Sequence, residues 1–315
     1  MALLIIGSHR AQEFYDAARR LSPERDIQLW PECNAPGEIE HALAWHPPKG
    51  ILKTFANLQS IVSVGAGVDH LFEDKDLPKV PIVRYVDPDL TGRMSEYIAL
   101  HTLYHARRMM DYQSQQRRAL WHYLPEPAAE EVRVGIMGLG VLGLAAAKVL
   151  STLGYQVRGW SRSLKHIEGI RCFAGQAELE PFLAETDILC VLLPLTPDTQ
   201  GILNRDLFQK LSTQGRSRRL PGPAIVNAGR GKLQNEVDIL DALEAGEIYS
   251  ASLDVFENEP LSPSSPLWQH PRIAITPHSA AESTTGNIVS YFLRHVSRAE
   301  NNEPYENVVD RIAGY

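Results

Sequence analysis

The segment Val132-Arg-Val-Gly-Ile-Met-Gly138-Leu-Gly140-Val-Leu-Gly143 decides the fold. It begins as an apolar run typical of a buried strand, continues with the spacing G-x-G-x-x-G, and leads into an alanine-rich helical pattern over Leu144–Leu153. In such a unit Gly138 permits a tight turn, Gly140 a close approach of ligand to backbone, and Gly143 close packing of helix on strand. The segment therefore predicts a parallel α/β fold.

The start of that helix is predicted to bind the pyrophosphate of a dinucleotide. The N–H groups near Val141 and Leu142 lack partners within the helix, and the helix dipole favours negative charge at this end. A glycine-rich turn that only packs would have the same spacing, so the flanking strand and helix carry the prediction.

The next expected strand, Gln156–Trp160, indicates which dinucleotide. A site for NAD usually has an acidic residue about 20 residues after the glycines, where it accepts hydrogen bonds from the ribose. Here Ser161, Arg162 and Lys165 stand instead, with no acid before Glu168. These side chains can donate to a 2′-phosphate. The sequence thus favours NADP(H) over NAD(H), with a merely solvent-exposed basic turn as the alternative.

The rest of the chain alternates short apolar runs with helical patterns, as doubly wound parallel sheets do. Further strands are expected at Leu3–Ile6, Ile61–Val64, Ile82–Val86, Ile188–Leu193, Ala224–Asn227, Ser250–Leu253 and Ile273–Thr276. Helices are expected near His9–Leu21, Leu52–Asn57 and Met94–Gln116.

Length and composition exclude several classes of protein. The 315 residues, 44% of them hydrophobic and 22% charged, suffice for about two domains with full cores. The apolar run Ile188–Leu193 is far shorter than the roughly 18 residues of a membrane span, and Ala2–Ile6 is too short for a signal-peptide core. The net charge of −7 argues against binding to nucleic acid or anionic lipid. The basic cluster Arg216, Arg218 and Arg219 is interpreted as a solvated loop.

The three cysteines, Cys33, Cys172 and Cys190, show neither a CxxC motif nor metal-ligand spacing. Cys190 lies in an apolar run and is interpreted as a buried thiol. We therefore expect no metal site, and a reducing, cytoplasmic setting fits best.

Three polar motifs follow expected strands. They are Asn227-Ala-Gly-Arg230-Gly231, Asp254-Val-Phe-Glu-Asn-Glu259 and Thr276-Pro277-His278. Ligands of doubly wound sheets bind beyond the carboxyl ends of the strands, so Arg230, Asp254 and His278 are expected to face one crevice. Each alone could be an ordinary loop residue, but together on a dinucleotide scaffold they indicate an active site.

With these motifs the chain resembles the D-2-hydroxyacid dehydrogenase family over nearly its whole length, and within it the bacterial glyoxylate/hydroxypyruvate reductase group. Supporting segments are Trp45-His46-Pro47-Pro48, Val64-Gly-Ala-Gly-Val-Asp69, Met94-Ser-Glu-Tyr97, Pro194-Leu-Thr-Pro197, Ser265-Pro-Leu-Trp-Gln-His-Pro271 and Gly314-Tyr315.

The resemblance implies two Rossmann-like, doubly wound parallel-sheet domains. A dinucleotide-binding domain, 99–283, would be inserted into a discontinuous substrate domain, 1–98 with 284–315. It also implies a homodimer, and NADPH-dependent reduction of small 2-oxo acids: glyoxylate to glycolate, and hydroxypyruvate to D-glycerate.

The resemblance further implies catalytic roles. Arg230 would bind the carboxylate and carbonyl oxygen of the substrate, His278 would protonate that oxygen, and Glu259 would keep His278 charged. A fixed guanidinium and imidazolium stabilise the negative charge that builds on a ketone oxygen during reduction. A histidine beside a carboxylate also has a pKa suited to an acid near neutral pH.

Binding roles are implied as well. Asp254 would hold the nicotinamide carboxamide, with Pro194, Thr199 and Ala228 also near the cofactor. The N–H groups of Ala66 and Gly67 would bind the substrate carboxylate. Tryptophans are expected at the substrate pocket, with Trp121 reaching from a partner subunit; the candidates are Trp45, Trp121 and Trp268.

One stretch departs from the family pattern, and two other functions remain open. The connection between Leu211 and Ala224 is several residues longer than usual and rich in Gly, Arg and Pro. The first alternative is an NAD-dependent dehydrogenase of another D-2-hydroxy acid. The second is a dinucleotide-sensing, corepressor-like interaction protein.

Overall fold

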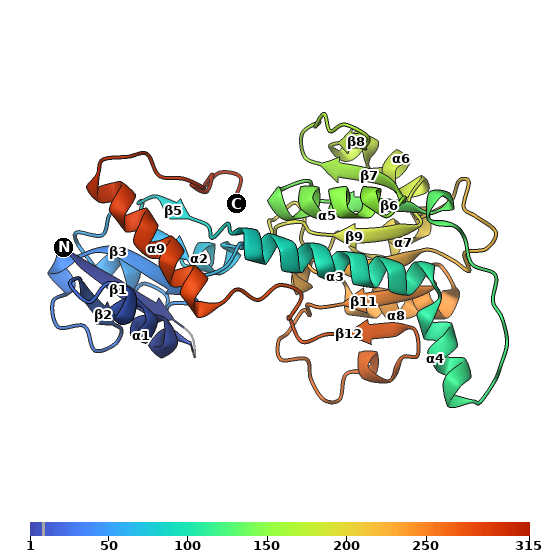
Figure 1. The fold of residues 1–315 in the computed structure, drawn as a ribbon, viewed down its shortest axis with the longest axis horizontal. Coiled ribbons are helices and arrows are strands. Elements are labelled where there is room, and N and C mark those ends of the chain that lie inside the picture. The colour runs from blue at the N-terminus through green and yellow to red at the C-terminus, as the bar shows by residue number, and fades with distance from the viewer. Residues whose placement is uncertain (8–9) are drawn as a thin grey trace. The chain divides into compact units, whose positions relative to one another are not determined.

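The computed structural model describes residues 1–7 and 10–315, and the chain divides into two compact units. One unit comprises residues 1–90 and 283–315, and the other comprises 91–282. Each is a parallel β-sheet flanked by helices (Figure 1), which confirms the predicted α/β class. The domain boundaries expected at 98/99 and 283/284 fall within helix α3 and just before helix α9.

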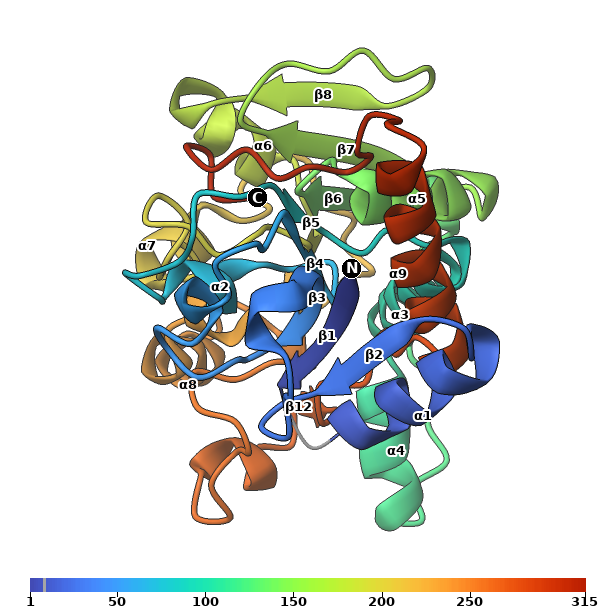
Figure 2. The same cartoon turned by 90° about the vertical axis from the view of Figure 1, so that its left-hand side faces the viewer.

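The first unit has five strands in the order β2-β1-β3-β4-β5, all parallel. The strands are β1 (Ala2–Gly7), β2 (Asp26–Leu29), β3 (Ile39–Trp45), β4 (Ser60–Ser63) and β5 (Ile82–Val83). The helices are α1 (Ala11–Leu21), α2 (Asp69–Phe72) and α9 (Thr285–Glu300). Helices α1 and α9 pack side by side, and α2 lies on the opposite side of the sheet (Figure 2).

A buried polar link joins the two chain segments of this unit. The Ser60 hydroxyl lies 2.8 Å from Nδ1 of His41 and 2.8 Å from Nε2 of His295 on α9. Burial lowers the pKa of His41, and burial together with the neighbouring His41 lowers the pKa of His295 to about 4. Both imidazoles are therefore neutral near pH 7.

The second unit has seven parallel strands in the order β12-β11-β10-β9-β6-β7-β8. The strands are β6 (Arg133–Met137), β7 (Gln156–Ser161), β8 (Arg171–Ala174), β9 (Ile188–Val191), β10 (Ala224–Asn227), β11 (Ser250–Leu253) and β12 (Ile273–Ile275). The helices are α3 (Pro88–Ala106), α4 (Met109–Arg117), α5 (Val141–Thr152), α6 (Leu179–Ala184), α7 (Arg205–Lys210) and α8 (Glu236–Ala245). The strand order reverses between β6 and β9, where such sheets bind ligands.

Both faces of this sheet are buried, which explains its continuous apolar strands. In β9, Leu189 and Val191 pack into one hydrophobic cluster with residues of α6, α7 and α8. Ile188 and Cys190 pack into a second cluster with residues of α3 and α5. The buried Cys190 thiol confirms the interpretation from sequence, and burial raises its pKa to about 12.

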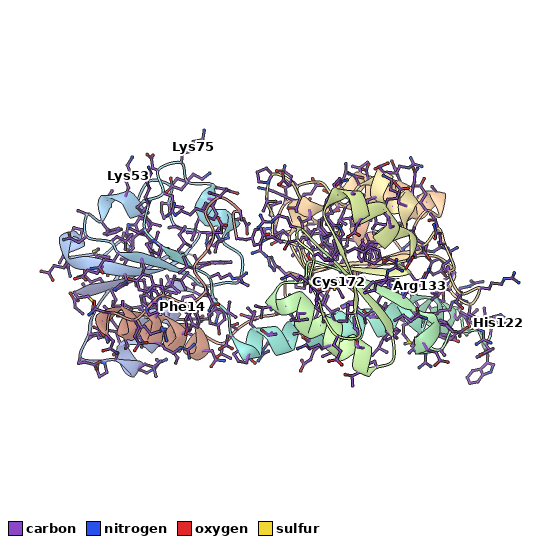
Figure 3. All side chains as sticks on the ribbon, turned by 90° about the horizontal axis from the view of Figure 1, so that it is seen from above. Phe14, Lys53, Lys75, His122, Arg133 and Cys172 are labelled. Carbon is purple, nitrogen blue, oxygen red and sulfur yellow. The ribbon has the colours of Figure 1, made fainter. Side chains whose placement is uncertain are left out.

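An internal ion pair anchors the start of β6. Arg133 Nε lies 2.9 Å from Oδ2 of Asp187, and its Nη2 lies 2.5 Å from Oδ1. The Ser212 hydroxyl donates to the same carboxylate, and all three residues are buried. Arg133 lies inside the second unit, whereas His122, on the segment after α4, lies at its outside (Figure 3). Ser212, the first residue of the long connection between Leu211 and Ala224, is therefore bonded to the buried interior of the second unit.

Two expected helices differ in the structure. The pattern Met94–Gln116 is two helices, α3 and α4, because the chain breaks at Arg108, whose φ of 55° is left-handed. The segment Leu52–Asn57 forms only a 3₁₀ turn over Leu52–Thr54, because the backbone is already extended at Phe55. The expected start of the first helix at His9 lies outside the described residues, and α1 begins at Ala11.

Strand predictions were incomplete. Strands β2, β3 and β8 were not expected, since polar residues interrupt their apolar character. Strands β5 and β9 end earlier than the expected Ile82–Val86 and Ile188–Leu193, because the last residues of each run belong to the loops that follow. Helix α5 begins at Val141 rather than Leu144.

The surface agrees with the composition. Among the described residues, no helix is both long and apolar enough to cross a membrane. Arg216, Arg218 and Arg219 are exposed in the long connection, which confirms a solvated loop there. The three cysteines are free thiols.

Candidate active site

The polar motifs of the second unit meet at one edge of its sheet. Strands β6, β9, β10, β11 and β12 are parallel neighbours, so the loops at their carboxyl ends share that edge. These loops carry the glycine motif, Pro194–Thr199, Arg230, Glu259 and His278. The sheet therefore places the residues expected to bind the dinucleotide and those expected to act in catalysis along the same edge.

The glycine turn has the geometry predicted for it. Gly138 has a φ of 109°, and a Cβ there would lie 2.7 Å from the Leu192 carbonyl oxygen. A Cβ on Gly143 would lie 1.9 Å from the Gly138 carbonyl oxygen, so only glycine lets α5 pack this closely. Gly140 precedes α5, no side chain caps the helix, and a Cβ on Gly140 would meet no described atom within 4 Å. The turn thus leaves the helix N-terminus accessible, as a pyrophosphate requires.

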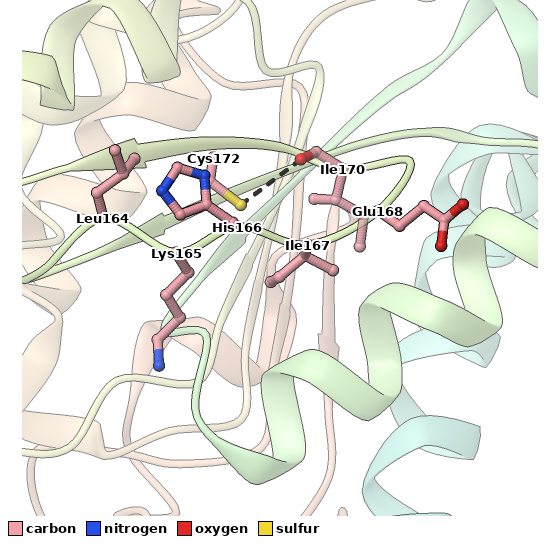
Figure 4. Close-up of a pocket in the computed structure, with 7 residues that line it drawn as sticks. All are labelled: Leu164, Lys165, His166, Ile167, Glu168, Ile170 and Cys172. Carbon is pink, nitrogen blue, oxygen red and sulfur yellow. Dashed lines mark hydrogen bonds between the residues drawn. The ribbon is translucent and has the colours of Figure 1, made fainter.

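The end of β7 carries the residues expected to recognise the coenzyme. Arg162 and Lys165 are exposed. Ser161 is buried, and its hydroxyl donates to the Ser163 carbonyl oxygen at 2.8 Å, so contact with a ligand would require a change of partner. Lys165 also lines a shallow hollow of about 500 Å³ between β7 and β8, where its side chain points away from Cys172 (Figure 4).

The loop after β9 is held by its own hydrogen bonds. The Thr199 hydroxyl donates to the Pro194 carbonyl oxygen at 2.7 Å and accepts from Thr196 N–H at 2.9 Å. In the next loop, Ala228 is buried and its N–H donates to the Val191 carbonyl oxygen. Hydrogen bonds therefore fix the loops after β9 and β10, and β9 is the neighbour of β6, the strand that leads into the glycine turn.

Arg230 lies on a turn that its neighbours fix. The buried Asn227 side chain accepts from Gly229 N–H at 3.1 Å and donates to the Arg230 carbonyl oxygen at 3.1 Å. A Cβ on Gly231 would lie 1.7 Å from the Phe256 carbonyl oxygen, so the turn packs directly on the loop after β11. The half-buried Arg230 side chain donates to the Gly229 carbonyl oxygen at 2.9 Å.

His278, Glu259 and Arg230 form one electrostatic cluster. Nδ1 of His278 lies 2.7 Å from Oε2 of Glu259, with side chains 47% and 36% exposed. The hydrogen bond to Glu259 raises the pKa of His278 against the opposing effects of burial and of Arg230. Burial alone would raise the pKa of Glu259, but hydrogen bonds from His278 and from Phe256 N–H lower it. The pair therefore favours an imidazolium beside a carboxylate.

The Asp254 carboxylate is hydrogen-bonded mainly to groups of the turn that follows β12. It is 1% exposed and accepts hydrogen bonds from the Thr276 hydroxyl at 2.6 Å, Ser279 N–H at 2.8 Å and Ala280 N–H at 3.0 Å. A carboxylate has about four acceptor positions, so about one remains for a ligand.

The substrate-binding candidates of the first unit follow neighbouring strands. Trp45 ends β3, and Ala66 and Gly67 lie in the loop after β4. A Cβ on Gly65 would lie 2.8 Å from the Trp45 ring, so the ring packs against this loop. Among the residues that the structure describes, the N–H groups of Ala66 and Gly67 donate to no protein atom. They are therefore available to an anion.

The other two tryptophans have exposed side chains in the second unit. Trp121 is fully exposed on the segment after α4. Trp268 is 46% exposed, and its indole N–H donates to the Ser262 carbonyl oxygen at 3.0 Å.

Sequence reasoning missed the residues that support the site. Asn227 and Thr276 stand in the polar motifs, and Tyr97 stands in the expected helix and in the segment Met94-Ser-Glu-Tyr97, but the sequence predicts a role for none of the three. The structure shows all three bonded to the loops that carry Arg230 and His278. A signal was present for Asn227 and Thr276, since each is a polar residue at the end of an apolar strand, but not for Tyr97, whose helix contains many polar residues.

Comparisons with known proteins show the family of this chain. The family described as D-isomer specific 2-hydroxyacid dehydrogenase, NAD binding domain, matches residues 99–280. Glyoxylate/hydroxypyruvate reductase A of Escherichia fergusonii is 39% identical over 306 residues, which cover 95% of this chain and 95% of that protein.

Solved structures are similar over the whole chain. The NADPH-dependent glyoxylate/hydroxypyruvate reductase of Sinorhizobium meliloti, in complex with NADP and sulfate, is 41% identical with a TM-score of 0.91. A probable 2-hydroxyacid dehydrogenase from Rhizobium etli, in complex with NADP, HEPES and L(+)-tartaric acid, is 43% identical with a TM-score of 0.93. Each likeness covers 100% of this chain and 99% of the other. The chain belongs to the D-isomer specific 2-hydroxyacid dehydrogenase family.

Proposed function

We propose that this chain is an NADPH-dependent reductase of small 2-oxo acids, converting glyoxylate to glycolate and hydroxypyruvate to D-glycerate. The observation that carries the proposal is the cluster of Arg230, Glu259 and His278 on the sheet edge that also bears the glycine turn. The similarity to glyoxylate/hydroxypyruvate reductases supports the choice of substrates.

The proposed chemistry needs one hydride and one proton. The reduced nicotinamide, when bound, supplies the hydride that forms the new C–H bond. His278 donates the proton that forms the O–H bond at the former carbonyl oxygen, so the ketone or aldehyde becomes an alcohol. Glu259 accepts from Nδ1, which leaves Nε2 as the nitrogen that gives up the proton.

Substrate binding is proposed to rest on charge and on backbone donors. The Arg230 guanidinium can bind a carboxylate through two parallel hydrogen bonds and stabilise charge on the adjacent oxygen. In the first unit, the N–H groups of Ala66 and Gly67 are the proposed carboxylate donors, beside Trp45.

Preference for NADP(H) over NAD(H) is supported by the end of β7. Arg162 and Lys165 are exposed cations at the position where an acidic residue would bind the ribose of NAD. The two similar structures from Sinorhizobium meliloti and Rhizobium etli are complexes with NADP. Pro194, Thr199, Ala228 and Asp254 are proposed to contact the coenzyme as well.

We also propose a homodimer in a reducing, cytoplasmic setting. Large apolar side chains are exposed along α3, α4 and the segment that follows, and a second copy would cover them. They are Leu100, Leu103, Met109, Leu120, Trp121 and Tyr123. The three free thiols fit a reducing compartment. Light scattering on the purified protein tests the dimer, and Leu103→Glu is expected to yield monomer.

The function is tested by a panel of oxo acids with each coenzyme. Glyoxylate, hydroxypyruvate, pyruvate and a phosphorylated oxo acid are each assayed with NADPH and with NADH, and His278→Asn serves as the inactive control. Fastest turnover of glyoxylate or hydroxypyruvate with NADPH is the expected result. Preference for NADH or for a larger acid would favour another dehydrogenase. Tight NADPH binding without turnover of any oxo acid would favour a dinucleotide-sensing protein.

A further inference from the structure

Asp254 accepts three hydrogen bonds from the turn that carries His278. The backbone N–H of His278 donates to the Asp254 carbonyl oxygen at 2.7 Å. The Asp254 carboxylate accepts from Ser279 and Ala280 N–H, on the other side of the histidine. His278 itself has a left-handed φ of 53°, which is costly for a residue with a side chain and persists only when its surroundings impose it. The placement of the imidazole therefore depends on the placement of Asp254.

A hydrogen-bonded chain leads from Asp254 to helix α3, and its direction is fixed by chemistry. An ionised carboxylate only accepts, so the Thr276 hydroxyl donates to Oδ1 of Asp254 at 2.6 Å. The Thr276 oxygen then accepts from the Tyr97 hydroxyl at 2.8 Å. Tyr97 is buried, and burial raises its pKa, so the phenol keeps its proton at any working pH.

Helix α3 is a firm support for this chain. The Tyr97 ring packs on His101, with centroids 4.2 Å apart, and His101 Nδ1 lies 2.7 Å from the Ser252 hydroxyl on β11. One turn further on, His105 lies within 2.9 Å of the hydroxyls of both Ser250 and Ser252. Tyr97, His101 and His105 are four residues apart, so one face of α3 is bonded along β11. The bonds between α3 and β11, with the packing of Tyr97 on His101, therefore fix the position of the Tyr97 side chain.

We propose that Tyr97 is a positioning residue of the active site, whose hydroxyl, through Thr276 and Asp254, holds the turn of His278 in the geometry needed for proton transfer. The proposal deepens the proposed reductase function, because it assumes that His278 is the proton donor. Since hydrogen bonds in a chain polarise one another, the phenol also strengthens the bond from Thr276 to Asp254. Its loss is expected to loosen the turn without removing a group that touches substrate.

Kinetics of Tyr97→Phe test the role, with Tyr104→Phe as the matched control. Tyr104 lies on the same helix and donates to Gln113 at an exposed site. Tyr97→Phe is expected to lower kcat about three- to tenfold, the range for one neutral hydrogen bond, while KM for the oxo acid stays unchanged. Thr276→Val is expected to lower kcat tenfold or more, because the lost bond is to a charged group. Thr276→Ser, which keeps the hydroxyl, is expected to restore it.

The pH profile separates positioning from general stability. His278 faces Glu259, Arg230 and Asp254, and its raised pKa depends first on the bond to Glu259. A looser turn weakens that bond, so the reduction rate in Tyr97→Phe is expected to fall off at lower pH than in wild type. Tyr104→Phe is expected to keep the wild-type profile.

Amide exchange tests the same role without substrate or coenzyme. The N–H groups of Ser279 and Ala280 are expected to exchange about three- to tenfold faster in Tyr97→Phe than in wild type and Tyr104→Phe. Exchange and pH profile identical to those of Tyr104→Phe would overturn the proposal, even if kcat fell. If wild type turned over no oxo acid, the reductase function would fail, whereas faster exchange would still establish the support of the turn by Tyr97.

Discussion

Nδ1 of His278 lies 2.7 Å from Oε2 of Glu259, and the two residues come from the loops that follow the neighbouring strands β12 and β11. The register of two parallel strands therefore sets the distance between the proposed acid and its carboxylate partner. Arg230, in the loop after the next strand, β10, lowers the pKa of both groups. Arg230 lowers the pKa of His278, whereas the hydrogen bond to Glu259 raises it and is the larger effect. Glu259 is therefore the residue that favours the charged form of the imidazole.

Glu259→Gln is expected to narrow the pH range of reduction. The hydrogen bond to Glu259 raises the pKa of His278, so the acid form persists to higher pH in wild type. Without the carboxylate charge that pKa falls, and the rate of reduction should decline at lower pH than in wild type. The measurement is kcat/KM against pH for both proteins. An unchanged profile would show that the pairing does not govern His278.

Arg230→Lys is expected to lower kcat/KM at least tenfold. Lysine keeps the charge but not the planar fork, and each lost charge-assisted hydrogen bond costs about 1.5–3 kcal/mol. NADPH affinity should change little. Arg216→Lys, at an exposed site in the long connection, is the control and should match wild type. Near-wild-type kinetics in Arg230→Lys would remove Arg230 from the catalytic residues.

Arg162→Ala is expected to weaken NADPH about tenfold to a hundredfold and to leave NADH nearly unchanged. The 2′-phosphate is the chemical difference between the coenzymes, and one guanidinium bond is worth about 1.5–3 kcal/mol. Replacing Ser161 with Asp should shift the ratio further, through repulsion of the phosphate and a new acceptor for the ribose of NADH. Fluorescence titration with each coenzyme gives the two affinities.

A double variant measures how much Lys165 contributes, beside Arg162, to recognition of the 2′-phosphate. If Lys165 also contacts the phosphate, the Arg162/Lys165 double alanine variant should lose more preference than Arg162→Ala alone. Arg218→Ala, in the exposed connection, is the charge-matched control. Equal binding of both coenzymes to wild type, or a preference retained by the double variant, would show that the end of β7 does not read the phosphate.

Asp187→Asn is expected to destabilise the protein by about 3–5 kcal/mol. The carboxylate is fully buried and bound to Arg133 and Ser212, so its neutralisation leaves an uncompensated guanidinium in the interior. The exposed Asp76, paired with the exposed Lys53, is the control, and Asp76→Asn should cost about 1 kcal/mol or less. Urea unfolding of the variants gives both values, and equal losses would contradict the prediction.

Acid is expected to destabilise the first unit through His295. Its pKa is about 4 in the folded chain and about 6.5 when unfolded, so the unfolded chain binds more protons between these values. Stability is therefore complete above pH 6.5 and falls by about 3 kcal/mol as the pH drops to 4. Urea unfolding across this range measures the slope, and His295→Gln should flatten it. An identical slope in that variant would exclude His295 as the source.

Much of the fold was predictable because its signals are local. The apolar strand, the glycine spacing and the helix after Gly143 follow one another directly along the chain, so the anion site required no tertiary information. The break at Arg108 had no such signal, since Met94–Gln116 contains neither glycine nor proline. Strand β3 was missed because Glu40 and His41 interrupt its apolar run, although His41 is buried through its bond to Ser60.

The site was predictable in its reacting residues but not in its supports. Arg230 and His278 stand in short motifs at strand ends, where the parallel sheet brings distant segments together. The bond between Tyr97 and Thr276 joins residues far apart in sequence, and neither residue type indicates the other. The Asp254 carboxylate accepts hydrogen bonds from the backbone N–H groups of Ser279 and Ala280. The spacing of residues in the sequence does not indicate such bonds.

The division of the first unit between residues 1–90 and 283–315 has a consequence for synthesis on the ribosome. Strands β1 to β5 emerge first, but α9, which packs on α1 and buries Ile288, Phe292 and Val296, emerges only after the whole second unit. Until then the nascent chain exposes the apolar surface that α9 covers. The second unit, contiguous from 91 to 282, can therefore complete its folding before the first, and premature release before α9 leaves an aggregation-prone product.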